Sequence, residues 1–342
     1  MTSNTLPRGS TPFLEAVDVR KGYRVHTAWT RFASITAVEG VSVRAWEGKT
    51  LAIAGESGCG KSTLGRLLLG LVWPEGGEIR FAGYPLAALR ESNWLDFRRS
   101  VQMVFQNPLA SFNPMLTVAG TISDAMRLRN DLPSRASKKE EAERLASQIG
   151  LEASLLKRYP SEMSAGQLQK AGIARALATK PRMVFLDEPT SALDASGRRQ
   201  IVDLLLALQS DVGLGYVLVA HDFHLIGTMA HHIVVMYLGQ VVEEGPAAEV
   251  LRRPLHPYSR ALLAASYVPS ARQSKWRIRG EVAQLPAGYQ GCRLYRRCPY
   301  AVLGCQELQT LVAIRPPHSV RCWRAAEIAG TSNNLERKND RG

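Results

Sequence analysis

The sequence predicts an α/β fold in which buried strands alternate with amphipathic helices around one sheet. Residues 51–54 and 183–186 are short, wholly apolar runs typical of buried strands, and a helical pattern follows each of them. Alternating polar and apolar residues within 13–43 add a pair of antiparallel strands. With 342 residues, of which 45% are hydrophobic, the chain can bury one large core and a smaller appendage.

A glycine-rich loop joins the first apolar strand to the helix that follows it. Its sequence, GESGCGKS at 55–62, has the spacing of loops whose backbone N–H groups and helix N-terminus surround phosphate oxygens. Glycines let the backbone approach the phosphates, Lys61 reaches the β- and γ-phosphates, and Ser62 ligates Mg²⁺. The predicted nucleotide-binding residues here are Gly55, Glu56, Ser57, Gly58, Cys59, Gly60, Lys61, Ser62 and Thr63.

Two further predicted strands end in side chains that can do chemistry. Asp187 and Glu188 follow the strand at 183–186, where the first carboxylate can hold Mg²⁺ and the second can polarise an attacking water. His221 follows the strand YVLVA and so falls where strand-end residues collect in an α/β sheet. Taken alone, a histidine in this position is more often a capping or surface residue.

The two N-terminal strands are expected to be separated by a loop that carries Tyr23, Trp29 and Phe32. Of these aromatic residues, Tyr23 is the one that we expect to stack on an adenine ring. Ordinary hydrophobic packing of Tyr23 is the alternative.

Residues 90–160 are charged and helical in pattern, including one amphipathic helix from about Ser134 to Ile149. A strand ending at Gln106 and a proline-broken loop come before that helix. From Ser161 a loop opens a further helix, which stops before Pro181.

The formal net charge of +13 is concentrated near the C-terminus. Residues 252–342 hold 16 Lys and Arg against 5 Asp and Glu, an excess of 16 − 5 = 11, so the rest of the chain is close to neutral. No base-stacking motif or recognition module accompanies this charge, which disfavours nucleic acid as a partner. No apolar run approaches the roughly 20 residues that span a bilayer, and the first residues lack the apolar core of a secretion signal. We therefore expect a cytoplasmic protein whose membrane role comes through a partner.

Six short motifs, in this order, together resemble those of the ATPase subunit of an ABC transporter. They are a Walker A loop (GESGCGKS, 55–62), a Q-loop glutamine (Gln106), a signature motif (MSAGQ, 163–167), a Walker B strand (MVFLDE, 183–188), a D-loop (SALD, 191–194) and a switch histidine (His221). The resemblance covers about residues 13–250. It implies a P-loop core with a mixed sheet, an antiparallel β subdomain and a helical subdomain at about 90–165 that docks on a membrane partner.

The resemblance also implies roles for these residues. ATP would lie between the Walker A loop of one subunit and the signature motif of another, in a head-to-tail dimer. Lys61 and the loop amides would hold phosphates, and Mg²⁺ would be held by Ser62, Gln106 and Asp187. Gln106 would also sense the γ-phosphate, Glu188 would be the general base, and His221 would position the γ-phosphate and water. The residues implied to meet the nucleotide across the dimer are Ser164, Ala165, Gly166, Gln167 and Asp194.

One signature residue departs from the usual LSGGQ pattern. Ala165 stands where the first glycine is usual, which adds a methyl group near the partner's nucleotide and keeps the backbone donor. We expect function to be retained.

The C-terminal part resembles the extension found in ATPases of oligopeptide, dipeptide and nickel importers. The similar stretches are LHPYSRALLAA at 255–265 and GCRLYRRCPYA at 291–301. In those relatives the extension helps to pair the ATPase subunits. The predicted organisation is a disordered N-terminus (1–12), an ABC ATPase domain (13–250), the extension (251–330) and a disordered tail (331–342).

Four of the five cysteines lie in the extension, within about thirty residues: Cys292, Cys298, Cys305 and Cys322. In a cytoplasmic protein such a group favours metal binding over disulfides, although the lack of a CxxC pair argues against an ordinary zinc ribbon. Some subfamily members resembling this stretch carry a [4Fe-4S] cluster, which four thiolates can hold. The resemblance thus implies an iron–sulfur cluster, with zinc or reduced structural thiols as alternatives. Its negative charge would explain the flanking arginines, Arg293, Arg296, Arg297, Arg321 and Arg324.

The predicted function is ATP hydrolysis that drives peptide import through two separate permease subunits, supplied by an extracytoplasmic solute-binding protein. The chain would lie peripherally on the cytoplasmic side of the cell membrane. A homologous second ATPase subunit would complete the dimer; we expect a different chain there, and a second copy of this chain is the alternative. Other cargoes are nickel or metal chelates and antimicrobial peptides. The competing classes are a soluble ABC ATPase acting on nucleic acid or ribosomes, and a regulatory subunit that binds ATP without hydrolysing it; Glu188 and His221 disfavour the latter.

Overall fold

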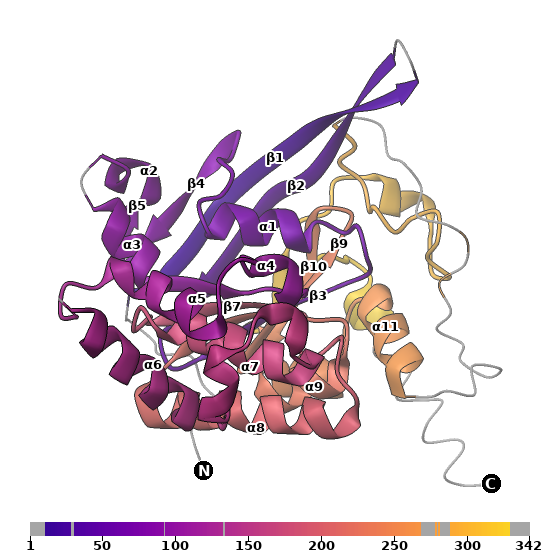
Figure 1. Cartoon of the computed structure of the whole chain (residues 1–342). Helices are drawn as coiled ribbons and strands as arrows, with labels where there is room; N and C mark the ends of the chain where they lie inside the picture. Colours follow the sequence, from indigo (N-terminus) through magenta and orange to yellow (C-terminus); the bar gives the residue numbers. More distant parts are fainter. Residues whose placement is uncertain are drawn as a thin grey trace, which may run out of the picture.

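The computed structural model describes residues 11–28, 31–91, 93–132, 134–267, 278, 280 and 288–328 (Figure 1). The termini predicted to be disordered, 1–12 and 331–342, lie outside these residues except for 11 and 12. Within the described part, no helix is both long and apolar enough to cross a membrane.

A mixed eight-stranded sheet forms the centre of the molecule, in the order β11-β12-β10-β9-β3-β8-β7-β6. Strands β9, β3, β8, β7 and β6 run parallel, and β10, β12 and β11 extend the sheet with antiparallel pairings. The strands are β3 (Thr50–Ala54), β6 (Val101–Val104), β7 (Met183–Asp187), β8 (Gly215–Val219), β9 (His232–Tyr237), β10 (Gln240–Pro246), β11 (Val312–Arg315) and β12 (His318–Val320).

Both faces of the central strands are buried. In β3, Leu51 and Ile53 join a core cluster shared with the antiparallel sheet, whereas Ala52 and Ala54 join a second cluster shared with the helices of the opposite face. Strands covered on both faces need apolar residues at every position, which explains the continuous apolar runs in the sequence.

A second, four-stranded antiparallel sheet has the order β2-β1-β4-β5, formed by β1 (Leu14–Ala28), β2 (Arg31–Ala45), β4 (Gly76–Phe81) and β5 (Tyr84–Pro85). Strands β1 and β2 form one long hairpin that projects beyond the rest of the sheet (Figure 1). The expectation that a loop carries Tyr23 was wrong, because Tyr23 lies within β1 and pairs with Ile35. The register shifts repeatedly between Ala16 and Gly22, and such bulges interrupt the alternation by which a strand is recognised.

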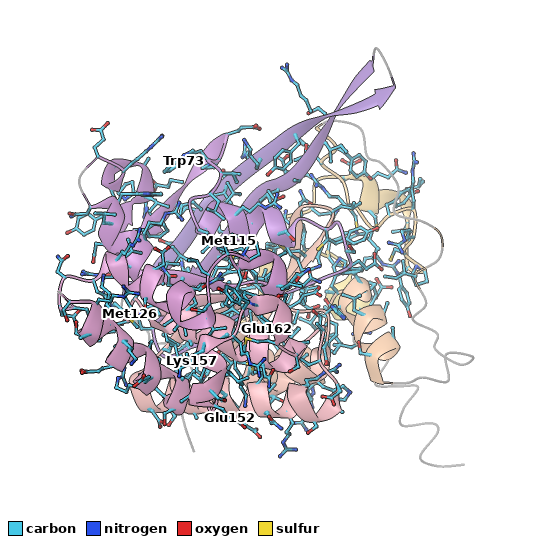
Figure 2. The ribbon with its side chains drawn as sticks, viewed as in Figure 1. Trp73, Met115, Met126, Glu152, Lys157 and Glu162 are labelled. Atoms are coloured by element: carbon cyan, nitrogen blue, oxygen red, sulfur yellow. The ribbon has the colours of Figure 1, made fainter. Side chains whose placement is uncertain are left out.

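Helix α1 (Lys61–Leu68) packs in the core cluster between the two sheets. The helical subdomain is formed largely by α3 (Trp94–Ser100), α4 (Pro108–Ser111), α5 (Val118–Ala125), α6 (Arg135–Gln148) and α7 (Ala165–Leu177), with α2 (Leu86–Leu89) before it. In this subdomain Met126 is fully buried, whereas Met115 is 81% exposed (Figure 2). The predicted helix at 134–149 is confirmed as α6, with Ser134 as its N-cap. Strand β6 interrupts the helical segment because residues 101–104 return to the main sheet, and it ends at Val104 rather than Gln106.

The remaining helices are α8 (Ala195–Val212), α9 (Phe223–Met229), α10 (Ala247–Arg252) and α11 (Pro257–Tyr267), with short 3-10 turns η1 (Met126–Leu128), η2 (Ala153–Lys157), η3 (Pro160–Glu162) and η4 (Leu303–Gln306). The last described part of the C-terminal extension, residues 288–328, lies beside α11 and strands β9 and β10 (Figure 1). Its strand β12 pairs with β10, with Val320 opposite Glu243. The main sheet therefore crosses the predicted boundary at residue 250.

Candidate functional site

The functional side chains predicted at the ends of strands meet at one edge of the main sheet. The parallel strands β3, β6, β7 and β8 end there and lead into the glycine-rich loop, Gln106, the Asp187–Glu188 pair and His221. All of these groups line one cavity of about 570 Å³. Its lining includes every predicted loop residue from Gly55 to Thr63 except the buried Cys59.

Two glycines of the loop are required by close contacts with neighbouring strands. Gly55 has a φ of +149°, and a Cβ added there would lie 2.3 Å from the carbonyl oxygen of Met236. Gly60 has a φ of +108°, and its added Cβ would lie 2.2 Å from the carbonyl oxygen of Ala37. Both distances are far inside van der Waals contact, so no side chain fits at either position.

Lys61 points back over the loop from the first turn of α1. Its Nζ donates to the carbonyl oxygens of Gly55 at 2.7 Å and Glu56 at 2.9 Å, and lies 3.7 Å from the Cys59 sulfur. Burial raises the pKa of the Cys59 thiol, which therefore stays protonated as a small packed side chain. The ammonium group of Lys61 stands among the loop amides at the helix N-terminus, where an anion is favoured.

Asp187 ends strand β7 and is half-buried beside another carboxylate. Burial, and then the charge of Glu188, raise the pKa of Asp187 above its usual range, with partial compensation from Lys61 and Arg66. A divalent cation at this position would stabilise the ionised form of Asp187. The ionised carboxylate of Asp187 is therefore unfavourable by itself in this environment and becomes favourable when a cation binds beside it.

Glu188 is held between two of the other predicted catalytic residues. Gln106 Nε2 donates to one carboxylate oxygen at 2.8 Å, and His221 Nδ1 lies 3.1 Å from the other. The backbone of Glu188 has a φ of 44°, in the left-handed region, and its N–H donates to the carbonyl oxygen of Val219 at 2.9 Å. A non-glycine residue in this conformation is strained by the order of 1 kcal/mol, a feature that clusters at functional sites.

Tyr23 does not line this cavity, which is bounded on that side by Ile35, Thr36 and Ala37 of β2. Its hydroxyl is buried and has no hydrogen-bond partner within the described residues, and the Lys21 ammonium lies 5.8 Å from its ring centroid. Its predicted stacking on adenine stays a prediction. Trp29 and the Phe32 side chain lie outside the described residues.

The signature residues lie at the start of α7 and are not brought together with the phosphate loop of the same chain. Ser164 caps the helix: its hydroxyl accepts from the Gln167 N–H at 3.3 Å, and the Gln167 side chain accepts from the Ser164 N–H at 2.9 Å. Ser164 and Ala165 are exposed, Gly166 and Gln167 are half-buried, and none of the four lines the cavity. Asp194 is likewise outside the cavity lining and caps α8, accepting from the Gly197 N–H at 2.8 Å.

Helix α11 contributes a wall of the cavity that the motif analysis missed. Leu262, Ala265 and Ser266 from this helix line the space together with Phe223 and Leu238. These residues follow no motif for nucleotide binding, so no local signal in the sequence could have identified them.

The four cysteines of the extension are close enough to affect one another's ionisation. Burial, together with the neighbouring cysteines, raises the pKa of Cys292 to about 12 and that of Cys322 to about 11, so both thiols are protonated at neutral pH. In the part of the chain that the structure describes, no three His, Cys, Asp or Glu side chains are arranged to hold a metal ion. The geometry therefore gives no support to the predicted iron–sulfur cluster or to zinc.

The arginines near the cysteines mostly bind other acceptors. Arg293 and Arg321 donate to the carbonyl oxygens of Leu238 and Val241, and Arg324 binds the Tyr300 carbonyl and Glu327. The interpretation that these charges balance a negative cluster is thus unnecessary, because backbone and carboxylate oxygens already accept their hydrogen bonds.

Comparison with known families agrees with both parts of this architecture. A model described as ABC transporter matches residues 38–191, and a model described as Oligopeptide/dipeptide transporter, C-terminal region, matches residues 242–305. Among solved structures, the chain is similar to a dimeric ATP-binding cassette in a post-hydrolysis state bound to ADP and Pi, with 27% identity and a TM-score of 0.61. That match covers 68% of this chain and 98% of the cassette. A similar match, with a TM-score of 0.60 and 26% identity, is to cbiO1 of the ABC transporter complex cbiONQ from Clostridium perfringens; it covers 70% of this chain and 91% of cbiO1.

Curated relatives resemble the chain over almost its whole length. The oligopeptide transport ATP-binding protein OppF of Escherichia coli is 37% identical over 94% of this chain and 98% of its own length. The probable D,D-dipeptide transport ATP-binding protein DdpF of the same organism is 41% identical over 85% and 91%. The di/tripeptide transport ATP-binding protein DppF of Pseudomonas aeruginosa is 37% identical over 93% and 99%. The chain belongs to the family of ATP-binding subunits of oligopeptide and dipeptide ABC transporters.

Proposed function

We propose that this chain hydrolyses ATP in the strand-end cavity and, as the energy-coupling subunit of an importer of dipeptides and oligopeptides, drives alternating access in separate membrane permeases. The observation that carries the proposal is the meeting of the phosphate loop, Asp187 and the Gln106–Glu188–His221 group in one cavity. Family membership supports the same activity, since its members are named as transport ATP-binding proteins.

Each group in the cavity has a definite part in phosphoryl transfer to water. The loop amides and Lys61 bind the phosphates, and Ser62, Gln106 and Asp187 hold Mg²⁺. When bound there, Mg²⁺ would supply a Lewis acid that polarises the phosphate oxygens. Glu188 accepts the proton of the attacking water, while Gln106 and His221 keep its carboxylate in place and contact the γ-phosphate.

The exposed N-terminus of α7, which carries the signature residues, supports a dimer in which a second subunit completes each ATP site. The four signature residues lie outside the cavity of their own chain, at the N-terminus of a helix of 13 residues. Such a terminus attracts phosphate, and Ala165 leaves its backbone N–H available. We propose a homologous but different ATPase chain as the partner, with two permeases and an extracytoplasmic solute-binding protein, on the cytoplasmic face of the membrane.

The four cysteines of the extension do not take part in the proposed ATP hydrolysis. An iron–sulfur cluster stays a prediction from the four cysteines, which the geometry of the described residues does not support. Iron and zinc content of the anaerobically purified full chain decides among the alternatives. Stoichiometric iron with visible absorbance favours the cluster, stoichiometric zinc favours a zinc site, and metal-free protein leaves structural thiols.

Transport by the reconstituted complex tests the proposed function. Proteoliposomes with both permeases, both ATPase chains and the binding protein are supplied with labelled dipeptides, oligopeptides or a nickel chelate. We expect peptide accumulation that requires ATP and stops with Glu188→Gln. Equal accumulation without ATP would contradict energy coupling, whereas ATP-driven uptake of the nickel chelate alone would contradict only the peptide cargo.

A further inference from the structure

Glu56, the second residue of the phosphate loop, is bound by two residues from the C-terminal extension. Its backbone N–H donates to the Tyr258 hydroxyl at 2.7 Å. Its carboxylate accepts from Arg297 Nη1 at 3.1 Å. Tyr258 and Arg297 are 202 and 241 residues away along the chain, so these contacts tie opposite ends of the sequence together at the loop.

These two contacts are part of a packed cluster. Tyr258 is fully buried and its ring lies 4.6 Å from that of Tyr237, centroid to centroid. The Arg297 side chain is 11% exposed and also donates to the Tyr237 hydroxyl at 3.1 Å. A half-buried guanidinium with a carboxylate and a second acceptor is held in one geometry, and removing either charge leaves the other poorly compensated.

The same residue of the loop is also bound by Lys61, through its backbone carbonyl group. The Glu56 carbonyl accepts from Lys61 Nζ at 2.9 Å, while its N–H is committed to Tyr258. The peptide groups around Glu56 therefore have a fixed orientation, and the extension sets it. Arg297 also neutralises a carboxylate that lines the cavity, where free negative charge would repel phosphates.

We infer that Tyr258 and Arg297 are positioning residues for the phosphate loop, which they orient through Glu56 so that it binds the triphosphate. This inference rests on the proposed function. It assigns the extension a part in nucleotide binding, in addition to the cavity wall formed by α11.

Matched pairs of variants in the full-length protein test this inference. Arg297→Gln removes the charge at Glu56, and Arg296→Gln removes the same charge from an adjacent, exposed position. Tyr258→Phe removes the hydroxyl and keeps the ring. Tyr295→Phe makes the same change at a hydroxyl that accepts from Gln306 and does not contact the loop. The measurements are ATP dissociation constants and melting temperatures of the purified chain, and kcat and KM of the assembled complex.

We expect Arg297→Gln to weaken ATP binding and raise KM by about tenfold with kcat nearly unchanged, the size expected for one lost hydrogen bond between charged groups. Tyr258→Phe should weaken binding by about threefold to tenfold, as for one lost neutral hydrogen bond. The two control variants should bind ATP like the wild type. Glu56→Gln added to Arg297→Gln should restore most of the affinity, because it removes the uncompensated carboxylate.

Two results would overturn the inference. One is ATP affinity in Arg297→Gln and Tyr258→Phe equal to that of the control variants. The other is a loss of affinity that follows the melting temperature and is not restored by Glu56→Gln, which would make the contact structural only. If wild-type protein does not bind ATP, the proposed function fails first, and the two failures are therefore distinguishable.

Discussion

The strand-end edge and the C-terminal extension both border the same cavity, but different kinds of contact place them there. At the carboxyl ends of the parallel strands, each functional residue lies at the end of a strand or in the short segment that follows it, as Glu188 does after β7. In the extension, Arg297 reaches Glu56 across 241 residues, and β12 joins the main sheet through β10. The catalytic residues are thus placed by short local segments of sequence, whereas the residues that hold the phosphate loop in position come from distant parts of the chain.

The largest loss of ATP affinity is expected from a substitution in the phosphate loop, at Gly60. In Gly60→Ala the added methyl would lie 2.2 Å from the Ala37 carbonyl oxygen, so the loop must move. A displacement of about 1 Å at such a site can cost about 100-fold, and we expect at least that loss of ATP affinity by calorimetry. The control is Gly58→Ala, where no atom lies within 4 Å of the added carbon and only left-handed strain of about 1 kcal/mol opposes it. Equal affinities in the two variants would contradict the close-contact explanation.

Asp187→Asn should have opposite effects on Mg²⁺ binding and on the stability of the folded protein. Because the pKa of Asp187 is raised in the folded protein, its ionised form costs stability at neutral pH. This cost develops as pH rises from the usual value of 3.8 through the raised pKa, and is constant above it. The neutral amide should therefore raise the melting temperature without nucleotide and abolish the extra stabilisation by Mg²⁺ with ATP. In the wild type, Mg²⁺ affinity should fall as pH decreases towards this raised pKa, since protons compete for the carboxylate. A less stable variant that still responds to Mg²⁺ would contradict the assignment.

On the extension side, His256 should make stability depend on pH. Burial lowers the pKa of His256 from 6.5 to about 4; Glu243 partly opposes this shift and Arg321 adds to it. The Nδ1 atom of His256 accepts from the Tyr258 N–H at 3.1 Å. Its contribution is complete above pH 6.5 and is lost as pH falls to about 4, a change of about 3 kcal/mol. His256→Asn keeps an acceptor and should reduce the slope of unfolding free energy against pH between 6.5 and 4.

Histidine variants away from α11 define the control for that slope. Burial also lowers the pKa of His232 to about 4, so part of the dependence should persist in His256→Asn. His224→Asn makes the same substitution at an exposed histidine and is the control for the substitution itself. An unaltered slope of unfolding free energy against pH in His256→Asn would contradict the prediction that buried His256 makes stability depend on pH.

The smallest effects are expected at two neighbouring acids of β10. Glu243 is fully buried and its carboxylate accepts from the N–H groups of Leu255 and His256 at 2.7 and 2.9 Å and contacts His318. Glu243→Gln should therefore cost about 2 kcal/mol in chemical denaturation. Burial raises the pKa of Glu244, so Glu244→Gln should be neutral or slightly stabilising at pH 7. A similar loss of stability in both variants would contradict the specific stabilisation that the hydrogen bonds of Glu243 to Leu255 and His256 provide.

The motif residues were predictable because each occupies a short segment with its own local pattern. Gly55, Lys61, Glu188 and His221 follow apolar strands, and parallel strands bring their ends to one edge whatever the details of packing. Both the α/β class and the family resemblance follow from such segments and are confirmed by the fold and the comparisons.

Other features depended on contacts that no local pattern contains. The bulges of β1 hide a long strand around Tyr23, and the pairing of Val320 with Glu243 carries the sheet past the predicted domain boundary. The contacts of Tyr258 and Arg297 with Glu56 join segments more than 200 residues apart. Sequence spacing also suggested a metal site at the cysteines, but spacing does not fix the distances between sulfur atoms, and the described residues form no group that could hold a metal ion.

The assignment of the strand-end cavity as the catalytic centre is tested most directly by ATP binding and turnover of Glu188→Gln in the assembled complex. The variant keeps the size of the side chain and one of the two oxygens that Gln106 and His221 contact in the wild type, but it cannot accept a proton. We predict ATP binding within about twofold of wild type, since the phosphates are held elsewhere, and turnover reduced by about 100-fold or more. ATP hydrolysis at the wild-type rate in this variant would contradict the assignment of the strand-end cavity as the catalytic centre.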